Sequence, residues 1–298
     1  MKKKVIVIVG QTSTGKSDLA VRVAKRFGGE VIIADSRQIY KGIDLGSGKI
    51  SQGEMDGVPH HLQDIIDPRE NFSVHNYRKL AEKKIKETIN RGKLPIVVGG
   101  TGFYVEALTA GIVLPGVPPN LRLRKKLAKR SAPALYAGLK RIDPARAATI
   151  DSNNKVRLIR AIEIASALGW VPKPRRGIPK FEFIKIGLIF PERILKKRIA
   201  TRLRARLRKG MAVELRRLHE EGIPWRRFEE LGFDQRYIAL YLQGKIPQKE
   251  MLEKLLQANW RYAKRQMTWF KRDSEIRWFR PHQFPQIGSY VKEMLLSA

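Results

Sequence analysis

Cysteine is absent from this 298-residue sequence, which excludes disulfide bonds and thiolate metal sites and is typical of a protein from a reducing compartment. Long apolar runs are also missing: the longest have only the length of a β-strand, and none could cross a bilayer. No secretory signal is visible, because three lysines at residues 2–4 precede a short apolar run that leads straight into a glycine-rich loop. We therefore expect a cytoplasmic protein that does not enter a membrane.

Acidic residues are scarce as well. The sequence has 28 Asp and Glu residues against 60 Lys and Arg residues, a formal net charge of +32. Residues 1–115 contain 18 basic and 12 acidic residues, whereas residues 116–298 contain 42 and 16, so most of the excess lies in the second part. Such a charge indicates a polyanionic partner, and binding to a nucleic acid would weaken steeply with salt. An anionic membrane surface is the competing partner.

A phosphate-binding loop follows the first apolar run. Residues 5–9 read as a strand, and residues 10–17 have the sequence GQTSTGKS, which matches the pattern G-x-x-x-x-G-K-S. In such a loop the backbone amides surround phosphate oxygens, the lysine adds a cation, and the serine hydroxyl binds Mg2+. The residues expected to bind a diphosphate here are Gly10, Thr12, Ser13, Thr14, Gly15, Lys16 and Ser17, with Ser17 as the Mg2+ ligand. The alternative is a glycine-rich turn with a surface lysine.

Four apolar runs predict strands of one parallel sheet, at residues 5–10, 30–35, 94–99 and 183–190. Helical patterns separate them, as in an α/β protein with the fold of the phosphate-loop NTPases. Because ligands bind at the carboxyl edge of such a sheet, the residues after each strand should converge. Asp35 is the carboxylate that a strand end delivers to this edge, and Thr101 follows another strand.

The pattern changes between residues 115 and 180, where prolines open and close a helical segment. We expect three domains: a phosphate-loop core (1–114), an inserted helical subdomain (115–180), and a part that completes the core and adds basic helices (181–298). The helices expected in the insertion cover residues 121–130, 132–140 and 153–168. The last of these should carry one apolar face made of Val156, Ile159, Ile162 and Ala165 or Ser166.

Two basic helical patterns follow. Residues 193–210 place cations around an apolar stripe, which suits either a nucleic-acid groove or a solvated surface. In residues 248–272 aromatic and cationic side chains alternate, as in helices that stack on bases and pair with phosphates. Trp260, Met267 and Phe270 could instead be core residues. We expect Lys264, Arg265 and Gln266 to face the ligand channel.

Several motifs together resemble the tRNA dimethylallyltransferases of the IPP transferase family, over nearly the whole chain. Besides the phosphate loop they are DSRQIYKG at 35–42, PHHL at 59–62, GGTGFY at 99–104, RLIRAIE at 157–163 and AKRQMTWF at 263–270. Three stretches depart from the family pattern: Asn153-Asn154 replaces an Asn-Asp pair, Gly232-Phe233-Asp234 replaces Gly-Tyr-Lys or Gly-Tyr-Arg, and residues 170–177 are rich in Pro and Arg. These departures bear on tRNA preference more than on chemistry.

The resemblance implies transfer of a dimethylallyl group from dimethylallyl diphosphate to N6 of the adenosine on the 3′ side of the anticodon. Asp35 would be the general base, although it could instead cap the turn at Ser36 or support Mg2+. Thr101 would hydrogen-bond a phosphate oxygen or merely cap the next helix. Arg265 would bind the diphosphate. The residues that would contact tRNA are Asp35, Ser36, Arg37, Gln38, Arg122, Val156, Arg157, Leu158, Ile159, Arg160, Lys264 and Gln266. Adjacent His60 and His61 are assigned to structure or RNA contact, because neighbouring residues do not share one face.

Other classes remain open. A small-molecule kinase of the nucleoside-monophosphate type has the same loop and sheet but no need for so basic a second half. An RNA-dependent ATPase would explain the charge, yet an acidic strand end and a nucleotide-sensing arginine set are not evident. A free-nucleotide isopentenyltransferase would share the chemistry without the basic tail. We expect a monomer with tRNA, dimethylallyl diphosphate and Mg2+ as its ligands.

Overall fold

The computed structural model describes residues 2–113, 115–173 and 175–297, which form two compact units. One unit combines Met1–Gly111 with Ile178–Ala298, and the other is Ile112–Gly177. The sequence analysis places the insertion at residues 115–180. Each unit has its own hydrophobic core and is described separately below.

A six-stranded parallel sheet is the centre of the first unit. Its strand order is β3-β2-β4-β1-β7-β8, and every neighbouring pair is parallel. The expected α/β fold with a parallel sheet is confirmed, and the four expected strands correspond to β1, β2, β4 and β7. The bounds are β1 Lys4–Gly10, β2 Gly29–Ile33, β3 His60–His61, β4 Leu94–Val98, β7 Glu182–Leu188 and β8 Arg277–Phe279.

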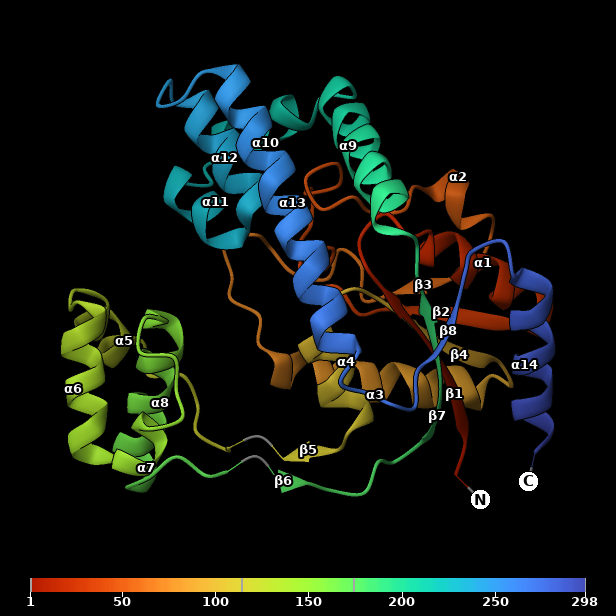
Figure 1. Cartoon of the computed structure of the whole chain (residues 1–298), viewed down its shortest axis with the longest axis horizontal. Helices are drawn as coiled ribbons and strands as arrows, with labels where there is room; N and C mark the ends of the chain where they lie inside the picture. The colour runs from red at the N-terminus through yellow and green to blue at the C-terminus, as the bar shows by residue number, and fades with distance from the viewer. Residues whose placement is uncertain (1, 114, 174, 298) are drawn as a thin grey trace. The chain divides into compact units, whose positions relative to one another are not determined.

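Helices cover both faces of this sheet (Figure 1). Because successive side chains of a strand point to opposite faces, the central strand β1 contributes to two cores. Ile6 and Ile8 pack with α1 (Lys16–Phe27) and α14 (Phe284–Leu296). Val5 and Val7 pack with α3 (Val74–Asn90) and α4 (Gly102–Thr109). Both faces of β1 are thus buried, which explains its uninterrupted apolar sequence.

A group of helices lies beyond the carboxyl edge of the sheet. Its core includes residues of the segment that follows β2, such as Ile39 and Ile43, together with Leu203 and Leu255. The longest helix links this group to the sheet, because Leu255 lies in the helical core while Phe270 packs under the sheet (Figure 1). The bounds are α2 Gln52–Met55, α9 Glu192–Arg208, α10 Met211–Glu220, α11 Trp225–Leu231, α12 Phe233–Leu242 and α13 Gln248–Phe270.

The second unit is helical, with a two-residue antiparallel ribbon at its ends. Leu135 and Leu139 of α6 pack on α8 in its core. The buried face of α8 was predicted wrongly at one position: Val156 is 78% exposed, and Leu158 is fully buried. The buried stripe is Leu158, Ala161, Ile162 and Ala165, which has the i, i+3, i+4, i+7 spacing of a helix face. The bounds are β5 Ile112–Val113, α5 Leu121–Ala128, α6 Ala132–Ile142, α7 Pro144–Ala147, α8 Lys155–Leu168 and β6 Arg175–Arg176.

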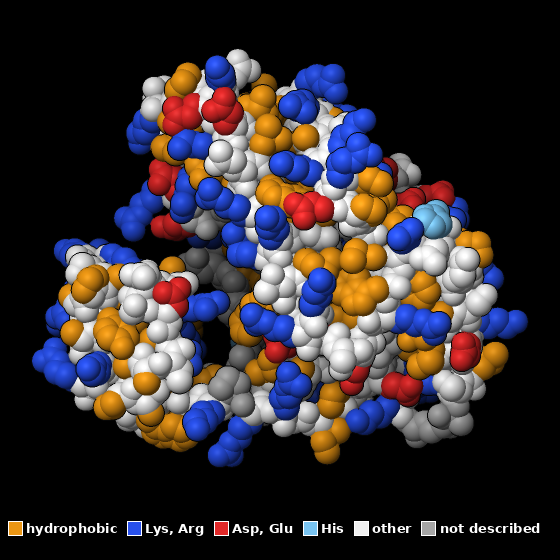
Figure 2. All heavy atoms as spheres, in the orientation of Figure 1, with side chains coloured by type: hydrophobic (Ala, Val, Ile, Leu, Met, Phe, Trp, Pro, Cys, Tyr) orange, Lys and Arg blue, Asp and Glu red, His pale blue; other side chains and the backbone are white. Residues whose placement is uncertain are grey.

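The surface reflects the composition. Figure 2 shows Lys and Arg side chains over much of the visible face, with fewer Asp and Glu between them. Among the described residues, no helix has the length and apolar character needed to cross a membrane.

Candidate active site

A cavity of about 1280 Å³ opens at the carboxyl ends of β1, β2 and β4. All of its lining residues belong to the first unit, and they come from the phosphate loop and the start of α1, the segments at and after the ends of β2 and β4, and helices α9, α12 and α13. Eight of them are Lys or Arg and four are Asp or Glu. Phe103, Ile194 and Trp269 add apolar surface, and the rings of Phe103 and Trp269 meet edge to face at 6.1 Å. The cavity therefore suits a ligand with an anionic part and an apolar part.

The phosphate loop connects β1 to α1. Gly10 has φ 146°, and a Cβ there would lie 2.7 Å from the Leu188 carbonyl oxygen, so only glycine fits beside β7. Of the residues expected to bind phosphate, the cavity is lined by Thr12, Ser13, Gly15, Lys16 and Ser17. Gly10 and Thr14 are outside the lining: the Thr14 side chain is buried and donates a hydrogen bond to the Gln11 carbonyl at 2.8 Å. Thr14 thus shapes the loop, and its hydroxyl is not available to a ligand.

Lys16 lies in a cationic environment. Its Nζ donates to the Gln11 carbonyl at 2.6 Å. Burial, followed by the nearby Arg202 cation, lowers the pKa of Lys16 to about 7, whereas the Asp35 carboxylate acts in the opposite direction. A buried lysine whose pKa is lowered further by a neighbouring cation forms a site prepared for an anionic ligand.

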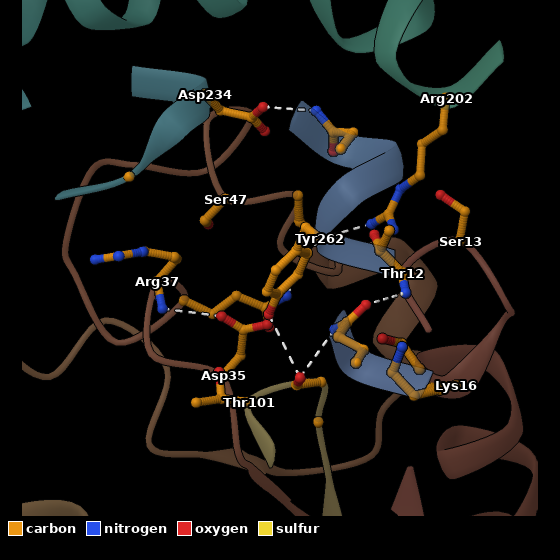
Figure 3. A pocket seen from close by; sticks show the side chains of 18 of the residues that line it. Thr12, Ser13, Lys16, Asp35, Arg37, Ser47, Thr101, Arg202, Asp234 and Tyr262 are labelled. Atoms are coloured by element: carbon orange, nitrogen blue, oxygen red, sulfur yellow. Dashed lines mark hydrogen bonds between the residues drawn. The ribbon is translucent and has the colours of Figure 1, made fainter. Parts of the chain in front are cut away.

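Asp35 and Thr101 follow β2 and β4 and lie side by side across from the phosphate loop (Figure 3). Asp35 Oδ1 accepts the Arg37 amide at 2.9 Å, so the turn-capping role considered for Asp35 is present. Its Oδ2 accepts no hydrogen bond from the described residues. Thr101 occupies the N-cap position of α4, but its side chain makes no capping hydrogen bond, and its Oγ1 instead accepts the Ser36 amide at 3.0 Å.

The Gly99-Gly100-Thr101-Gly102 turn is explained by close approaches. A Cβ at Gly99 would lie 2.0 Å from the Ala34 carbonyl oxygen, and one at Gly102 would lie 2.4 Å from the Trp269 ring. Absence of side chains at these positions therefore lets β4, β2 and α13 meet directly beneath Thr101. The Tyr262 hydroxyl on α13 completes this wall, donating to the Gly100 carbonyl at 3.4 Å.

Two of the three α13 residues expected to face the ligand channel, Arg265 and Gln266, line the cavity. Gln266 is buried, with 4% of its surface exposed, and both of its side-chain polar atoms are paired inside the protein: Oε1 accepts the Thr12 amide at 2.7 Å and Nε2 donates to the Gly100 carbonyl at 2.8 Å. Gln266 nevertheless lines the cavity, and its contact with tRNA stays a prediction. Arg265 does line the cavity. Lys264 is outside the lining, with its Nζ 5.3 Å from the centre of the Trp260 ring.

Helix α9 supplies arginines that the sequence analysis did not single out. Arg198, Arg202 and Arg206 are spaced four residues apart and all line the cavity. Arg198 Nε donates to the Ser13 carbonyl at 2.9 Å, and Arg202 Nη2 donates to the Gly48 carbonyl at 2.8 Å. Their i, i+4, i+8 spacing places them on one side of the helix, beside its buried stripe.

The other residues expected to contact tRNA fall into two groups. Ser36, Arg37 and Gln38 line the cavity next to Asp35. The rest belong to the helical unit, where Arg122, Val156 and Arg157 are exposed and Ile159 is partly buried. Leu158 is a correction, because its side chain is fully buried in that unit's core. Arg160 is already engaged, since it forms an ion pair with Glu163 and donates to the Val117 carbonyl at 2.8 Å.

The adjacent histidines make structural contacts. His61 Nε2 lies 2.7 Å from Glu30 Oε2, and His60 Nδ1 lies 2.8 Å from the Val58 carbonyl. Within residues 2–113, 115–173 and 175–297, no cluster of three or more His, Cys, Asp or Glu side chains could hold a metal ion by itself. A cation in the cavity would need ligand atoms from an anionic substrate as well.

Comparisons with known proteins agree on one family. The family model described as IPP transferase matches residues 38–273. A curated relative named tRNA dimethylallyltransferase, from Anoxybacillus flavithermus, is 39% identical over 94% of this chain and 91% of its own length. The crystal structure of the full-length tRNA isopentenylpyrophosphate transferase from Bacillus halodurans is 36% identical, with a TM-score of 0.75, over 99% of this chain and 97% of that one. A eukaryotic dimethylallyltransferase whose structure is described as acting on tRNA is 26% identical, with a TM-score of 0.77, over 99% of this chain and 78% of its own.

Proposed function

The chain belongs to the IPP transferase family and is a prenyl transferase, and we propose that it moves the dimethylallyl group of dimethylallyl diphosphate to the exocyclic N6 of the adenosine 3′-adjacent to the anticodon of tRNA. The observation that carries the proposal is one cavity in which Lys16 of the phosphate loop faces Asp35 and Thr101 at two strand ends. This arrangement joins a diphosphate subsite to an acceptor for one proton. A transfer from a diphosphate to an amine needs both.

The diphosphate would bind at the cationic end of the cavity. Lys16, Arg198, Arg202 and Arg265 supply positive charge there, and the loop amides add hydrogen-bond donors. The five-carbon group is apolar, and Phe103 and Trp269 offer apolar surface in the same cavity. As the C–O bond breaks, negative charge grows on the leaving diphosphate, and fixed cations stabilise that charge more than they stabilise the bound substrate.

Asp35 would act on the adenine amine. In the step we propose, the N6 nitrogen forms a bond to C1 of the dimethylallyl group, the C–O bond to diphosphate breaks, and one N6 proton passes to Asp35. Oδ1 is held by the Arg37 amide, which fixes the carboxylate while Oδ2 stays available to take the proton. Thr101 would donate a hydrogen bond to an oxygen of the departing diphosphate and keep its proton. A positioned base of this kind contributes about a hundredfold or more to the rate.

Mg2+ is the metal we propose for the diphosphate subsite. Ser17 and the carboxylate of Asp18 line the cavity beside Lys16, and a magnesium ion typically takes few protein ligands together with phosphate oxygens and water. When bound there, Mg2+ would supply charge neutralisation for the leaving diphosphate.

The nucleic acid partner we propose is the anticodon stem-loop. The target adenine would leave its stack to reach Asp35, which costs only a few kcal/mol in a single-stranded loop. Ser36, Arg37 and Gln38 lie next to Asp35 and would contact the flipped nucleotide. The exposed cations of the helical unit, Arg122 and Arg157 among them, would neutralise phosphates.

One assay tests the proposed function. Purified protein is incubated with radiolabelled dimethylallyl diphosphate, Mg2+ and bulk tRNA, and label in the RNA is measured. We expect label in tRNA with the wild type and a severe loss with Lys16→Ala, while the matched control Lys86→Ala, at an exposed position of α3, keeps full activity. ATP should be neither required nor hydrolysed. Robust ATP turnover without labelling would instead identify a phosphate-loop kinase or an RNA-dependent ATPase.

A further inference from the structure

Asp234 is a buried carboxylate in the cavity wall, with 8% of its surface exposed, and it lies in the stretch that departs from the family pattern. Both of its oxygens have partners. Oδ2 accepts from Arg206 Nη2 at 3.1 Å and Oδ1 accepts from Asn259 Nδ2 at 2.8 Å. Asp234 therefore differs from Asp35, whose Oδ2 remains available, and it is not suited to take up a proton from a substrate.

Arg206 connects Asp234 to a loop that also lines the cavity. Its Nε donates to the Leu45 carbonyl, and its Nη2 donates to the Gly46 carbonyl at 2.7 Å. Gln235, the residue after Asp234, donates to the same Gly46 carbonyl at 2.9 Å. The carbonyl side of residues 45–46 is therefore held by α9 and α12 together.

The amide side of the same loop is held by Glu214 of α10. Its Oε2 accepts the Asp44 and Leu45 amides at 3.0 and 2.8 Å, and its Oε1 accepts the Gly46 amide at 2.8 Å. Gly46 is confined by these contacts, because a Cβ there would lie 3.0 Å from Glu214 Oε1. The backbone of residues 44–46 is thus held through its amides by Glu214 and through its carbonyls by Arg206 and Gln235.

The far end of this loop orients a cation of the diphosphate subsite. The Gly48 carbonyl accepts from Arg202 Nη2 at 2.8 Å. Burial, and next the Arg206 cation, lowers the pKa of Arg202, whereas Glu54, Asp35 and then Asp234 act in the opposite direction. Arg202 is in turn one of the groups that depress the pKa of Lys16. Asp234 is the counter-ion of Arg206, and its other oxygen is held by Asn259, so it lies in the cavity wall with both oxygens engaged (Figure 3).

We propose that Asp234 is a positioning residue for the transfer reaction: through Arg206 and residues 44–48 it holds Arg202 beside Lys16, where the leaving diphosphate develops charge. The inference rests on the proposed function and deepens it. A cation displaced from this position still attracts a bound diphosphate, but it no longer matches the charge distribution of the transition state. The rate of transfer should therefore depend on Asp234 much more than diphosphate binding does.

The variant Asp234→Asn tests this directly, because it keeps the size of the side chain and an oxygen for Asn259 while removing the carboxylate that pairs with Arg206. We expect kcat for tRNA labelling to fall by about tenfold or more. The dissociation constant of inorganic diphosphate, measured by calorimetry, should change by less than about threefold. Lys16 and Arg202, the cations proposed to attract the diphosphate, are both still present in the variant. The control Glu250→Gln removes an exposed carboxylate paired with Lys254 on α13 and should change neither quantity.

A double-mutant cycle separates positioning from general destabilisation. If Asp234 acts through Arg206, the double variant Asp234→Asn/Arg206→Gln should be about as slow as the slower single variant, because both changes break one network. Rate losses that multiply in the double variant would overturn the proposal. So would an unchanged kcat in Asp234→Asn, or a loss of rate that only follows a loss of folded protein in thermal unfolding.

Hydrogen exchange provides a readout that needs no enzymatic activity. In Asp234→Asn the amides of residues 44–48 should exchange faster, while those of α3 should not change. If Asp234→Asn does not fold, Arg206→Lys gives the same test, since lysine keeps the charge but not the planar fork that reaches the Leu45 and Gly46 carbonyls. Unchanged exchange in the loop would overturn the positioning role. If the wild type labels no tRNA, but residues 44–48 still exchange faster in Asp234→Asn than in the wild type, the proposed function is refuted and the loop contact stands.

Discussion

Gln266 and Thr12 are joined by a hydrogen bond across almost the whole sequence: the Thr12 amide donates to Gln266 Oε1 at 2.7 Å. The other end of the same side chain donates to the Gly100 carbonyl at 2.8 Å. One glutamine of α13 therefore fixes the phosphate loop and the turn that carries Thr101 relative to each other. The geometry of the proposed diphosphate subsite therefore depends on a residue of α13.

Replacing Gln266 with Ala should impair both stability and catalysis. The Thr12 amide and the Gly100 carbonyl would lose their partner at a buried position, which typically costs about 1–3 kcal/mol. We expect a lower melting temperature and a higher KM for dimethylallyl diphosphate. Gln243→Ala is the control, since Gln243 makes one hydrogen bond to the Ala239 carbonyl of its own helix, at 3.0 Å. Equal effects of the two variants on KM would contradict this role of Gln266.

Asp35→Ala should nearly abolish transfer and leave tRNA affinity within a few-fold of the wild type, because the carboxylate is proposed to act on a proton. Single-turnover labelling and filter binding measure the two quantities separately. Asp35→Asn is the sharper variant, since its amide oxygen can still accept the Arg37 amide and keep the turn. Loss of tRNA affinity in step with loss of rate, in both variants, would argue against a general base.

The sequence was sufficient for features with a local pattern. The central strands have continuous apolar runs, and the phosphate loop has a fixed spacing, so both could be placed, and Asp35 followed from its position after a strand. Strands β3 and β8 could not be found, because two and three residues carry no periodicity. The hydrogen bonds of Gln266 with Thr12 and Gly100 could not be predicted either, because they join residues far apart in the sequence.

The arginines of α9 illustrate the same limit. The helix could be predicted, but its exposed and pocket-facing cations look alike in sequence, and tertiary packing of Leu195, Ile199 and Leu203 decides which ones turn toward the cavity. In α8 two apolar stripes overlap in the sequence, and packing against α6 selects the one that contains Leu158 and not Val156.

Binding of the diphosphate should depend on pH through Lys16. In the free protein the pKa of Lys16 is about 7, and a bound anion would raise that pKa, so binding above pH 7 requires uptake of a proton. Affinity should be greatest near and below pH 7 and should fall as pH rises above it, by up to about tenfold per unit. Calorimetry from pH 7 to 9 measures this. Lys16→Arg is the control, because arginine stays protonated and its profile should lack the decrease attributed to Lys16.

The last prediction separates two arginines of α8 that lie three residues apart. Arg157 is exposed, whereas Arg160 forms an ion pair with Glu163, a carboxylate with no exposed side-chain surface. Burial alone would raise the pKa of Glu163, but hydrogen bonds from Arg124 and Arg160 lower it to about 2, so this carboxylate stays charged and needs its cations. Arg157 is thus free to neutralise a phosphate, and Arg160 stabilises the helical unit.

We therefore expect Arg157→Gln to weaken tRNA binding and to flatten the slope of log K against log salt by about 0.7 to 0.9, the contribution of one phosphate contact. Arg160→Gln should instead lower the melting temperature, because the buried Glu163 carboxylate would lose one of its two cations and keep only Arg124. Filter binding at several salt concentrations and thermal unfolding measure the two effects. Neutralising phosphates always releases counterions, so tRNA binding through this face must depend on salt. A wild-type slope near zero would therefore show that the helical unit does not bind tRNA through this face. An Arg157→Gln variant with unchanged affinity and slope would show the same.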